Sequence, residues 1–508
     1  MQPIISAPEW NEALSRFPIP SGQNASRILV CGPKSSGKST FTKLLSNRLL
    51  SYATEKTTSP RKAQKPSGVA ILDLDPGQPE YSVPGQVSLV HIQEPNFGPP
   101  FSHPMPDGNS RILRAHSIAA NTPSMDPSLY MACVLDLFAH YRHLLAALPN
   151  SPLIINTPGW VLGTGLEILV DLIANIRPTE VIYMSQEGPL EVVESLRDAA
   201  KTTPVLTLPS QVSKYVTKTA AHLRTMQAMS YFHIDPSNGK YLTWQSQPLS
   251  SVPPWEIMYS GEKAGILGIM CYGEQPPPDL LLESINGSIL AVVVIDNIAA
   301  IPGWKTDEQD TMDEDANPNS LDPYSVDPED TELRALDDAS LHPHHLAKPI
   351  LVRTPTEDLP YFNPANAICV DPNHSHCIGL ALVRGIDVPR RQLQIITPIS
   401  SSVIEEINET GKSIVLVSGK FDTPGWAYIE ELVQRQTLEK ASKNQTGDGM
   451  DIVEDEETSD TDDIGRGARD LGGGFQNAPW VERQEGSQGR AVGSRVWRVR
   501  RDLGRSGD

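Results

Sequence analysis

This 508-residue sequence has few long hydrophobic runs, few cysteines and no recognisable secretory signal. No stretch reaches the roughly 18 consecutive apolar residues that a membrane helix needs, and the nearest candidate, residues 289–301, is interrupted by Asp296 and Asn297. The five cysteines are scattered, which is typical of reduced thiols rather than of a disulfide framework. The first residues lack the basic start and apolar run of a secretory signal. These features predict a soluble intracellular protein with no membrane partner.

Basic residues are outnumbered, and the net charge of −20 at first argues against a nucleic-acid partner. The excess is confined to two segments: residues 307–338 carry −12 and residues 451–463 carry −8. Acidic segments that are poor in apolar residues are typical of disorder. The rest of the chain is therefore neutral and free to carry local basic patches, so the net charge does not decide the partner.

A phosphate-binding signature stands between an apolar run at 27–31 and a helical pattern at 38–50. It matches GxxxxGK[ST] at every required position. Its glycines let backbone N–H groups converge on phosphate, and the helix N-terminus adds a favourable dipole. Lys38 can reach the β- and γ-phosphates, and the Ser39 hydroxyl can ligate Mg²⁺. The extra base Lys34 could contact phosphate or point to solvent. The predicted nucleotide-binding residues are Gly32, Pro33, Lys34, Ser35, Ser36, Gly37, Lys38, Ser39 and Thr40.

The order of apolar runs predicts an α/β fold: a parallel sheet of the P-loop NTPase type with flanking helices, followed by a mainly β C-terminal domain. The first half alternates helical patterns with five short apolar strands, at 27–31, 69–74, 153–156, 181–184 and 205–208, and the second half has β-rich runs separated by Gly and Pro. The predicted segments are an N-terminal lead at 1–24, the P-loop kinase domain at 25–225, the β domain at 226–440 with a disordered acidic insert at 307–346, a disordered acidic linker at 441–480, and a basic tail at 481–508.

Two acids follow the second predicted strand, in the sequence LDLDPGQPE at residues 72–80. Asp73 and Asp75 are two positions apart, so both point to one face. One can organise Mg²⁺ and its waters, and the other can accept a proton from an attacking hydroxyl, which contributes about 10²–10⁴-fold. The alternative is that Asp73 is a surface acid and only Asp75 acts. No NKxD motif follows, which argues against a GTPase and favours a kinase.

Five motifs together resemble the polynucleotide 5′-hydroxyl kinases, and within that family the nucleolar branch that processes pre-ribosomal RNA. The motifs are residues 32–39, 73–86 (DLDPGQPEYSVPGQ), 156–165 (NTPGWVLGTG), 223–233 (LRTMQAMSYFH) and 377–387 (CIGLALVRGID). The resemblance covers about residues 27–435. It implies an ATP- and Mg²⁺-dependent kinase that phosphorylates the 5′-hydroxyl end of RNA during ribosomal spacer processing. It further implies an endoribonuclease partner and a location in the nucleus and nucleolus. The family also carries a substantial domain before the P-loop, which here begins at residue 32.

The resemblance assigns roles to individual residues. Lys38 and Ser39 match the family's phosphate and Mg²⁺ residues, and Asp75 matches its proposed general base. Asp73 is the predicted carboxylate ligand of that Mg²⁺ because of its place at the end of the second predicted strand. Gln78 lies where it could hold Mg²⁺ waters or the hydroxyl end of the RNA. Trp160 matches a residue that stacks on the terminal base, worth roughly 1–3 kcal/mol; ordinary core packing is the alternative for this side chain.

A mobile lid in this family supplies arginine to the transferring phosphoryl group. Arg224 is the candidate here, with Lys214 and Lys218 upstream, and a finger of this kind contributes about 10³–10⁵ in rate. A helix-surface arginine is the alternative. Two rival functions also remain: a P-loop kinase of small molecules, and a non-catalytic ATP-binding scaffold of an RNA-processing complex.

Overall fold

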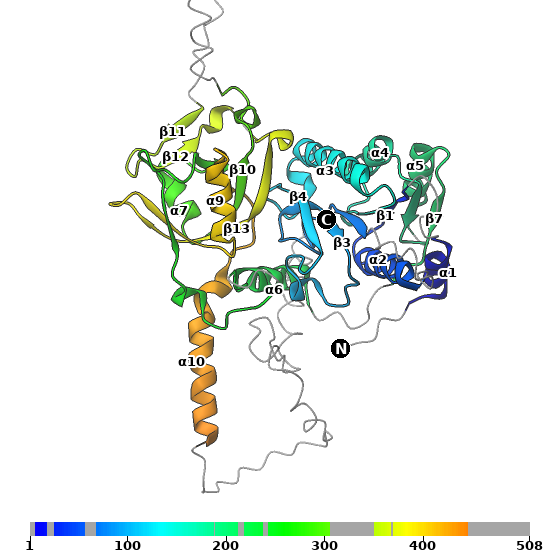
Figure 1. Cartoon of the computed structure of the whole chain (residues 1–508), viewed down its shortest axis with the longest axis horizontal. Coiled ribbons are helices and arrows are strands. Elements are labelled where there is room, and N and C mark those ends of the chain that lie inside the picture. Colours follow the sequence, from blue (N-terminus) through cyan, green and yellow to red (C-terminus); the bar gives the residue numbers. More distant parts are fainter. Residues whose placement is uncertain are drawn as a thin grey trace, which may run out of the picture.

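The computed structural model describes residues 6–17, 25–55, 68–186, 188–211, 218–236, 242–304, 350–366 and 369–445. Two sheets lie side by side, each with its own helices (Figure 1). The predicted acidic insert, the basic tail and the predicted linker beyond Gln445 lie outside these residues. None of the described helices is both long and apolar enough to cross a membrane.

The first sheet confirms the predicted α/β domain. Its strand order is β4-β3-β2-β5-β1-β6-β7, and the five predicted strands are parallel. Two strands that the sequence pattern did not predict, β3 and β4, extend it antiparallel at one edge. The strands are β1 (Arg27–Cys31), β2 (Val69–Asp73), β3 (Gln86–Ile92), β4 (Arg111–Ser117), β5 (Leu153–Asn156), β6 (Glu180–Tyr183) and β7 (Val205–Thr207).

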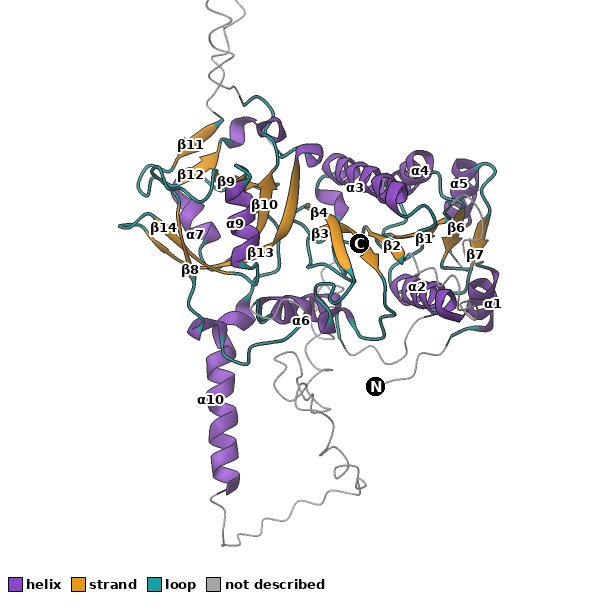
Figure 2. Ribbon diagram, in the orientation of Figure 1, coloured by secondary structure: helices purple, strands orange, loops and turns teal. Residues whose placement is uncertain are grey.

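Helices cover both faces of this sheet because its strands are apolar on both sides. Ile28 and Val30 of β1 pack in one core with α1 and α2, while Leu29 packs in the other with α3, α4 and α5. Figure 2 shows these two helical layers. The helices are α1 (Pro8–Arg16), α2 (Lys38–Glu55), α3 (Pro127–Ala147), α4 (Thr164–Ile176), α5 (Leu190–Ala200) and α6 (Ala220–Phe232).

Helix α1 lies within residues 1–24, which were predicted only as an N-terminal lead. Its Trp10 is buried, donates its indole N–H to the Pro209 carbonyl at 2.8 Å, and meets Phe41 of α2 edge to face. At the other end of the domain, α6 runs through the predicted boundary at 225/226. The first domain therefore extends beyond its predicted limits of 25 and 225 at both ends, through α1 and α6.

The second sheet confirms the predicted mainly β domain, in the order β11-β12-β9-β15-β10-β13-β14-β8. Alternate residues of β10 face two cores: Leu290 and Val292 pack with α7 and α9, and Ala291 and Val293 join the core of the first domain. The strands are β8 (Trp255–Met258), β9 (Gly268–Cys271), β10 (Ile289–Ile295), β11 (Leu351–Arg353), β12 (Pro360–Phe362), β13 (Ser375–Asp387), β14 (Gln392–Ile396) and β15 (Ser413–Ser418), and the helices are α7 (Leu281–Ile285), α9 (Ser401–Glu409) and α10 (Gly425–Gln445). Short 3₁₀ turns are η1 (Pro100–Ser102), η2 (Pro123–Met125), η3 (Leu249–Ser251), η4 (Pro278–Leu280), η5 (Ile298–Ala300), η6 (Pro364–Asn366) and η7 (Pro372–His374).

Arg114 of β4 fastens the two domains together. Its guanidinium donates to Asp136 of α3 at 3.2 Å and to Asp296, just after β10, at 3.0 Å. It also donates to the carbonyls of Pro372 and Ser375. Burial alone raises the pKa of Asp296, but hydrogen bonds from Lys412, His376 and Arg114 outweigh it and hold that pKa at about 2. At this contact between the domains, the Arg114 guanidinium and the Asp296 carboxylate are both charged, and each has hydrogen-bond partners.

We expect Arg114→Met to lower the free energy of unfolding by about 3 kcal/mol, because removing one partner leaves buried charges uncompensated. Chemical denaturation measures the loss. The control is Arg435→Met, which removes an exposed pair with Glu431 in α10 and should cost at most about 0.5 kcal/mol. Equal losses in the two variants would contradict the role given to Arg114.

Candidate active site

The predicted nucleotide-binding residues form one continuous loop from β1 into the first turn of α2. Gly32 has φ +146°, and a Cβ there would lie 3.0 Å from the backbone nitrogen of Met184. Gly37 has φ +98°, and a Cβ there would lie 2.7 Å from the Trp10 ring. The loop thus packs against Trp10 of α1 and against Met184, the residue after β6. Only glycine fits at Gly32 and Gly37 without a shift of these neighbours.

Lys38 is the first residue of α2 and is almost fully buried. Its ammonium donates to the Pro33 carbonyl at 3.0 Å. Burial lowers the pKa of Lys38, while the nearby negative charge of Asp75 opposes that shift. Lys34 is exposed, and its charge also reaches Asp75, where it lowers the carboxyl pKa. The extra base of the loop thus lies near the predicted general base.

Asp73 ends β2 and has no exposed surface, so the reading of this residue as a surface acid is wrong. One carboxylate oxygen accepts the Glu80 backbone N–H at 2.6 Å, and the other accepts the Asn156 amide at 3.0 Å. Burial raises the pKa of Asp73 to about 7, against the effect of these two hydrogen bonds. The carboxylate is thus held from both sides in a fixed direction.

Asp75 lies two residues further, at the start of a tight turn. Its Oδ1 accepts the backbone N–H groups of Gly77 at 3.0 Å and Gln78 at 3.3 Å. Burial raises the pKa of Asp75, while the charge of Lys38 opposes the shift. The structure therefore brings Lys38 and Asp75 within electrostatic reach. A carboxylate with a raised pKa is better suited to accept a proton near neutrality.

Asn156, at the end of β5, is a site residue that the sequence reasoning missed. Its Oδ1 is buried, and it makes no hydrogen bond within the described part of the chain; the same holds for Thr42 Oγ1. Both residues line a small cavity, together with Ser39 and Asp73. Carboxylate, amide and hydroxyl oxygens are the donors that Mg²⁺ prefers, so the residues present fit this ion. A buried strand that ends in asparagine beside the P-loop is the signal that could have revealed Asn156.

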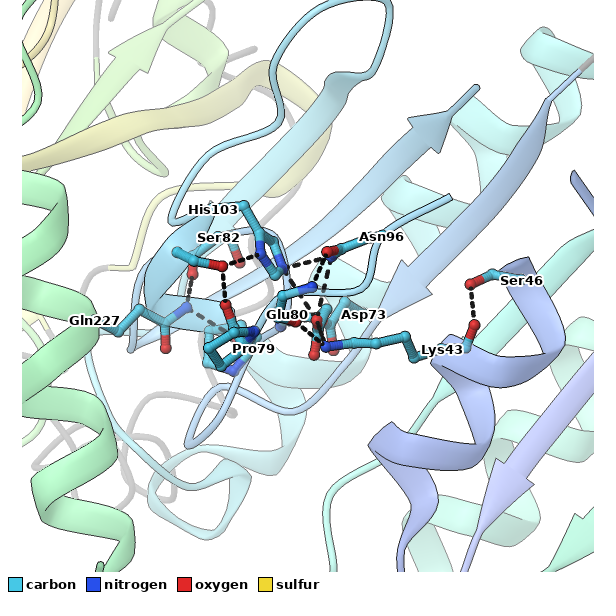
Figure 3. A network of polar contacts seen from close by, with 12 residues as sticks. Lys43, Ser46, Asp73, Pro79, Glu80, Ser82, Asn96, His103 and Gln227 are labelled. Atoms are coloured by element: carbon cyan, nitrogen blue, oxygen red, sulfur yellow. Dashed lines mark hydrogen bonds and ion pairs between the residues drawn. The ribbon is translucent and has the colours of Figure 1, made fainter. Parts of the chain in front are cut away.

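A buried ionic network joins α2, the helix that follows the P-loop, to the loop between β2 and β3, residues 74–85 (Figure 3). We call this segment the acidic loop. Lys43, one turn after Ser39, pairs with the Glu80 carboxylate, and His103 contacts the same oxygen at 3.0 Å. Burial alone raises the pKa of Glu80, but the hydrogen bond of His103 and the charge of Lys43 outweigh it and lower that pKa. Because the Glu80 N–H holds Asp73, this network fixes Asp73 relative to α2. The sequence shows no direct sign of this network, because the burial of Glu80 becomes visible only in the folded chain.

Two residues of α6 hold the same region from the other side. Gln227 donates to the carbonyls of Pro79 and Ser82, at 2.9 and 2.6 Å (Figure 3). One turn earlier, Arg224 pairs with Asp422 of the second domain, with 2.6 Å between Nε and Oδ2. The structure thus places Arg224 at the joint between domains, and its catalytic role stays a prediction.

The other predicted site residues occupy distinct positions. Lys218 donates to the Met226 sulfur at 3.1 Å, and Lys214 lies outside the described residues. Gln78 is half-buried in the Asp75 turn. Trp160 is half-buried and packs against the core of the first domain, so its role in base stacking stays a prediction.

Gly159 of the NTPGW motif touches the P-loop backbone. A Cβ there would lie 2.6 Å from Lys34 Cα and 2.8 Å from its nitrogen. We expect Gly159→Ala to displace the loop and raise the Kd for MgATP at least about tenfold, or ~1.4 kcal/mol. Titration calorimetry measures this. Gly425→Ala, where the added Cβ meets no neighbour within 4 Å, should leave the affinity unchanged, and an unchanged Gly159→Ala would contradict the contact.

The Glu80 network predicts a pH-dependent loss of stability. At pH 7, Glu80→Gln leaves Lys43 unpaired and should lower the free energy of unfolding by about 3 kcal/mol. The pKa of Glu80 is lowered in the folded state from its usual 4.5, so the stabilisation is present above pH 4.5 and is lost as the pH falls through the folded pKa. Thermal unfolding from pH 7 to pH 3 should therefore show the two proteins converging.

The matched control is Glu12→Gln, which removes an exposed pair with Arg16 in α1. It should lower the free energy of unfolding by at most about 0.5 kcal/mol. A Glu80→Gln difference that is the same at every pH would show that the ion pair is not its source.

The P-loop domain and the whole chain both have known relatives. The model of the mRNA cleavage and polyadenylation factor CLP1 P-loop matches residues 32–234. Polynucleotide 5′-hydroxyl-kinase GRC3 of Gibberella zeae is 41% identical over 522 residues, which cover 100% of this chain and 64% of the relative. The kinase of the same name from Aspergillus oryzae is 40% identical over 99% of this chain and 62% of the relative.

The chain thus spans about three fifths of the length of these curated relatives. Among solved structures, the wild-type Clp1p–Pcf11p complex has a TM-score of 0.46 and 15% identity, over 81% of this chain and 77% of that chain, which is too distant to inform the site. By sequence, the chain is thus similar over nearly its whole length to proteins named polynucleotide 5′-hydroxyl-kinase, as its motifs predicted, and residues 32–234 match the CLP1 P-loop model.

Proposed function

We propose that this chain is an ATP-dependent polynucleotide 5′-hydroxyl kinase that phosphorylates the 5′-hydroxyl end of RNA. The observation that carries the proposal is the convergence of Lys38, at the start of α2, with Asp73 and Asp75, at the end of β2 and in the turn that follows. A buried cation beside two carboxylates of different environment suits phosphoryl transfer, in which catalysis is mostly positioning and charge stabilisation.

The loop at residues 32–37 would hold the nucleotide phosphates through its backbone N–H groups, with Lys38 at the β- and γ-phosphates. Ser39, Asp73 and Asn156 would hold Mg²⁺, which neutralises charge on the transferring phosphoryl group. Asp73 is oriented for this by the Glu80 N–H and the Asn156 amide. In this proposal, residues of the chain would set the metal side of the reaction before the acceptor binds.

On the acceptor side, Asp75 would take the proton of the RNA 5′-hydroxyl. The 5′-oxygen then forms a bond to the γ-phosphorus, the bond from that phosphorus to the β,γ-bridging oxygen breaks, and ADP leaves with the bonding electron pair. Gln78, held in the Asp75 turn, would position the hydroxyl end, and Trp160 would stack on the terminal base. Arg224 would reach the phosphoryl group only after release from Asp422.

We also propose the cellular setting implied by the resemblance. The acceptor would be RNA cleaved in a ribosomal spacer by an endoribonuclease partner, and the location would be the nucleus and nucleolus. The neutral charge of the chain outside its two acidic segments is compatible with an RNA substrate.

The decisive experiment is transfer from γ-labelled ATP to a short 5′-hydroxyl RNA, with a free nucleoside as the competing acceptor. Wild-type protein should label the RNA, and both Lys38→Ala and Asp75→Asn should lower the rate by about 10²-fold or more. Labelling of the nucleoside alone would indicate a small-molecule kinase. ATP binding without transfer, unchanged by Asp75→Asn, would overturn the enzyme and favour the scaffold.

A further inference from the structure

A second cavity, of about 330 Å³, opens at the junction of the two domains. It lies at the carboxyl ends of β9 and β15, which run parallel and pair Cys271 with Ser418. Its wall also includes Lys420, Gln275 and, from η2 of the first domain, Met125. The carboxyl ends of adjacent parallel strands are a common place for ligands in α/β sheets, and the volume is within the range of small-molecule sites.

Backbone contacts through residues 119–121 connect the wall of this cavity to the turn that carries Asp75. Ala120, which follows β4, forms a parallel bridge with Lys420, and the Lys420 N–H donates to the Ala119 carbonyl at 2.7 Å. The next residue, Asn121, packs against the active-site turn: a Cβ on Gly77 would lie 2.8 Å from its carbonyl oxygen. Since neighbouring strands lie about 4.8 Å apart, the cavity begins only a short step beyond the Asp75 turn.

The wall has the mixed chemistry of a nucleotide site. Lys420 is exposed in the cavity wall and makes no ion pair with any described residue, so its ammonium is available to a phosphate. Met125 is 45% exposed and offers an apolar face to a base. Gln275 and Ser418 supply hydrogen-bonding groups, and Glu274 supplies an acceptor for a hydroxyl or amino group. One cation beside apolar surface fits a single nucleotide of a chain better than a free polyphosphate.

We propose that this cavity binds an internal nucleotide of the acceptor RNA, a few positions 3′ of the end that is phosphorylated. The inference rests on the proposed function, because it takes the Asp75 turn as the place of the RNA 5′ end. It gives the β domain a part in substrate selection: RNA long enough to reach from Asp75 to Lys420 gains contacts that a dinucleotide does not make.

The test compares two 5′-hydroxyl acceptors, a dinucleotide and a 12-nucleotide RNA. Lys420→Glu should raise the KM of the 12-mer about tenfold, equivalent to ~1.4 kcal/mol, and change the KM of the dinucleotide less than about twofold. Ser284→Trp, at an exposed position of α7 in the cavity wall, should act in the same direction without a change of charge. Lys263→Glu makes the matched charge reversal on the connection between β8 and β9, and should change neither KM.

Equal effects of Lys420→Glu on both acceptors, or no effect on either, would overturn the cavity proposal; a cavity that receives a protein segment would give the second result. Wild-type protein that phosphorylates neither acceptor would overturn the proposed function instead. Binding of a 3′-labelled 12-mer, followed by fluorescence anisotropy, then decides the cavity alone. Weaker binding in Lys420→Glu but not in Lys263→Glu supports it, and equal binding in all three proteins refutes it.

Discussion

The arrangement of the site depends on one buried carboxylate. Asp73 has no exposed surface, and it keeps its place because the Glu80 N–H and the Asn156 amide each hold one of its oxygens. Glu80 in turn is tied to the P-loop helix through Lys43. An unpaired carboxylate at such a depth would be strongly unfavourable, so the hydrogen bonds are a condition of the fold as well as of the site. The distance between phosphate loop and acids is thereby fixed.

The same site is also held by α6, which in turn pairs with the second domain. Gln227 of α6 binds the carbonyls beside the acidic loop, while Arg224, on the same helix, pairs with Asp422. Arg114 closes the joint at the far edge of the first sheet. Both sheets contribute to one core, which also contains Leu74 and Val83 of the loop that carries Asp75. Arg224 would have to release Asp422 before it could act as the predicted lid arginine at the phosphoryl group.

Local patterns predicted the parts of this structure that follow from local rules. The five parallel strands, the helices between them and the loop at residues 32–39 were predictable from apolar runs and glycine spacing. Strands β3 and β4 were not, because polar residues such as Gln86, His91 and Arg114 interrupt their apolar pattern and find partners only in the folded chain. Helix α1 was missed because it is only nine residues long and buries only three of them, Trp10, Ala13 and Leu14. Asn156, Lys43 and His103 were missed because their roles arise from contacts between distant segments.

The central claim is that the two acids divide the work, with Asp73 on the metal and Asp75 on the proton. The dependence of RNA phosphorylation on Mg²⁺ concentration tests this most directly, measured for wild type, Asp73→Asn and Asp75→Asn. We predict that Asp73→Asn raises the Mg²⁺ concentration for half-maximal rate at least about tenfold, ~1.4 kcal/mol of lost metal binding. Asp75→Asn should leave that concentration within about twofold and lower the maximal rate by about 10²–10⁴. The same Mg²⁺ shift in both variants would contradict the division of roles.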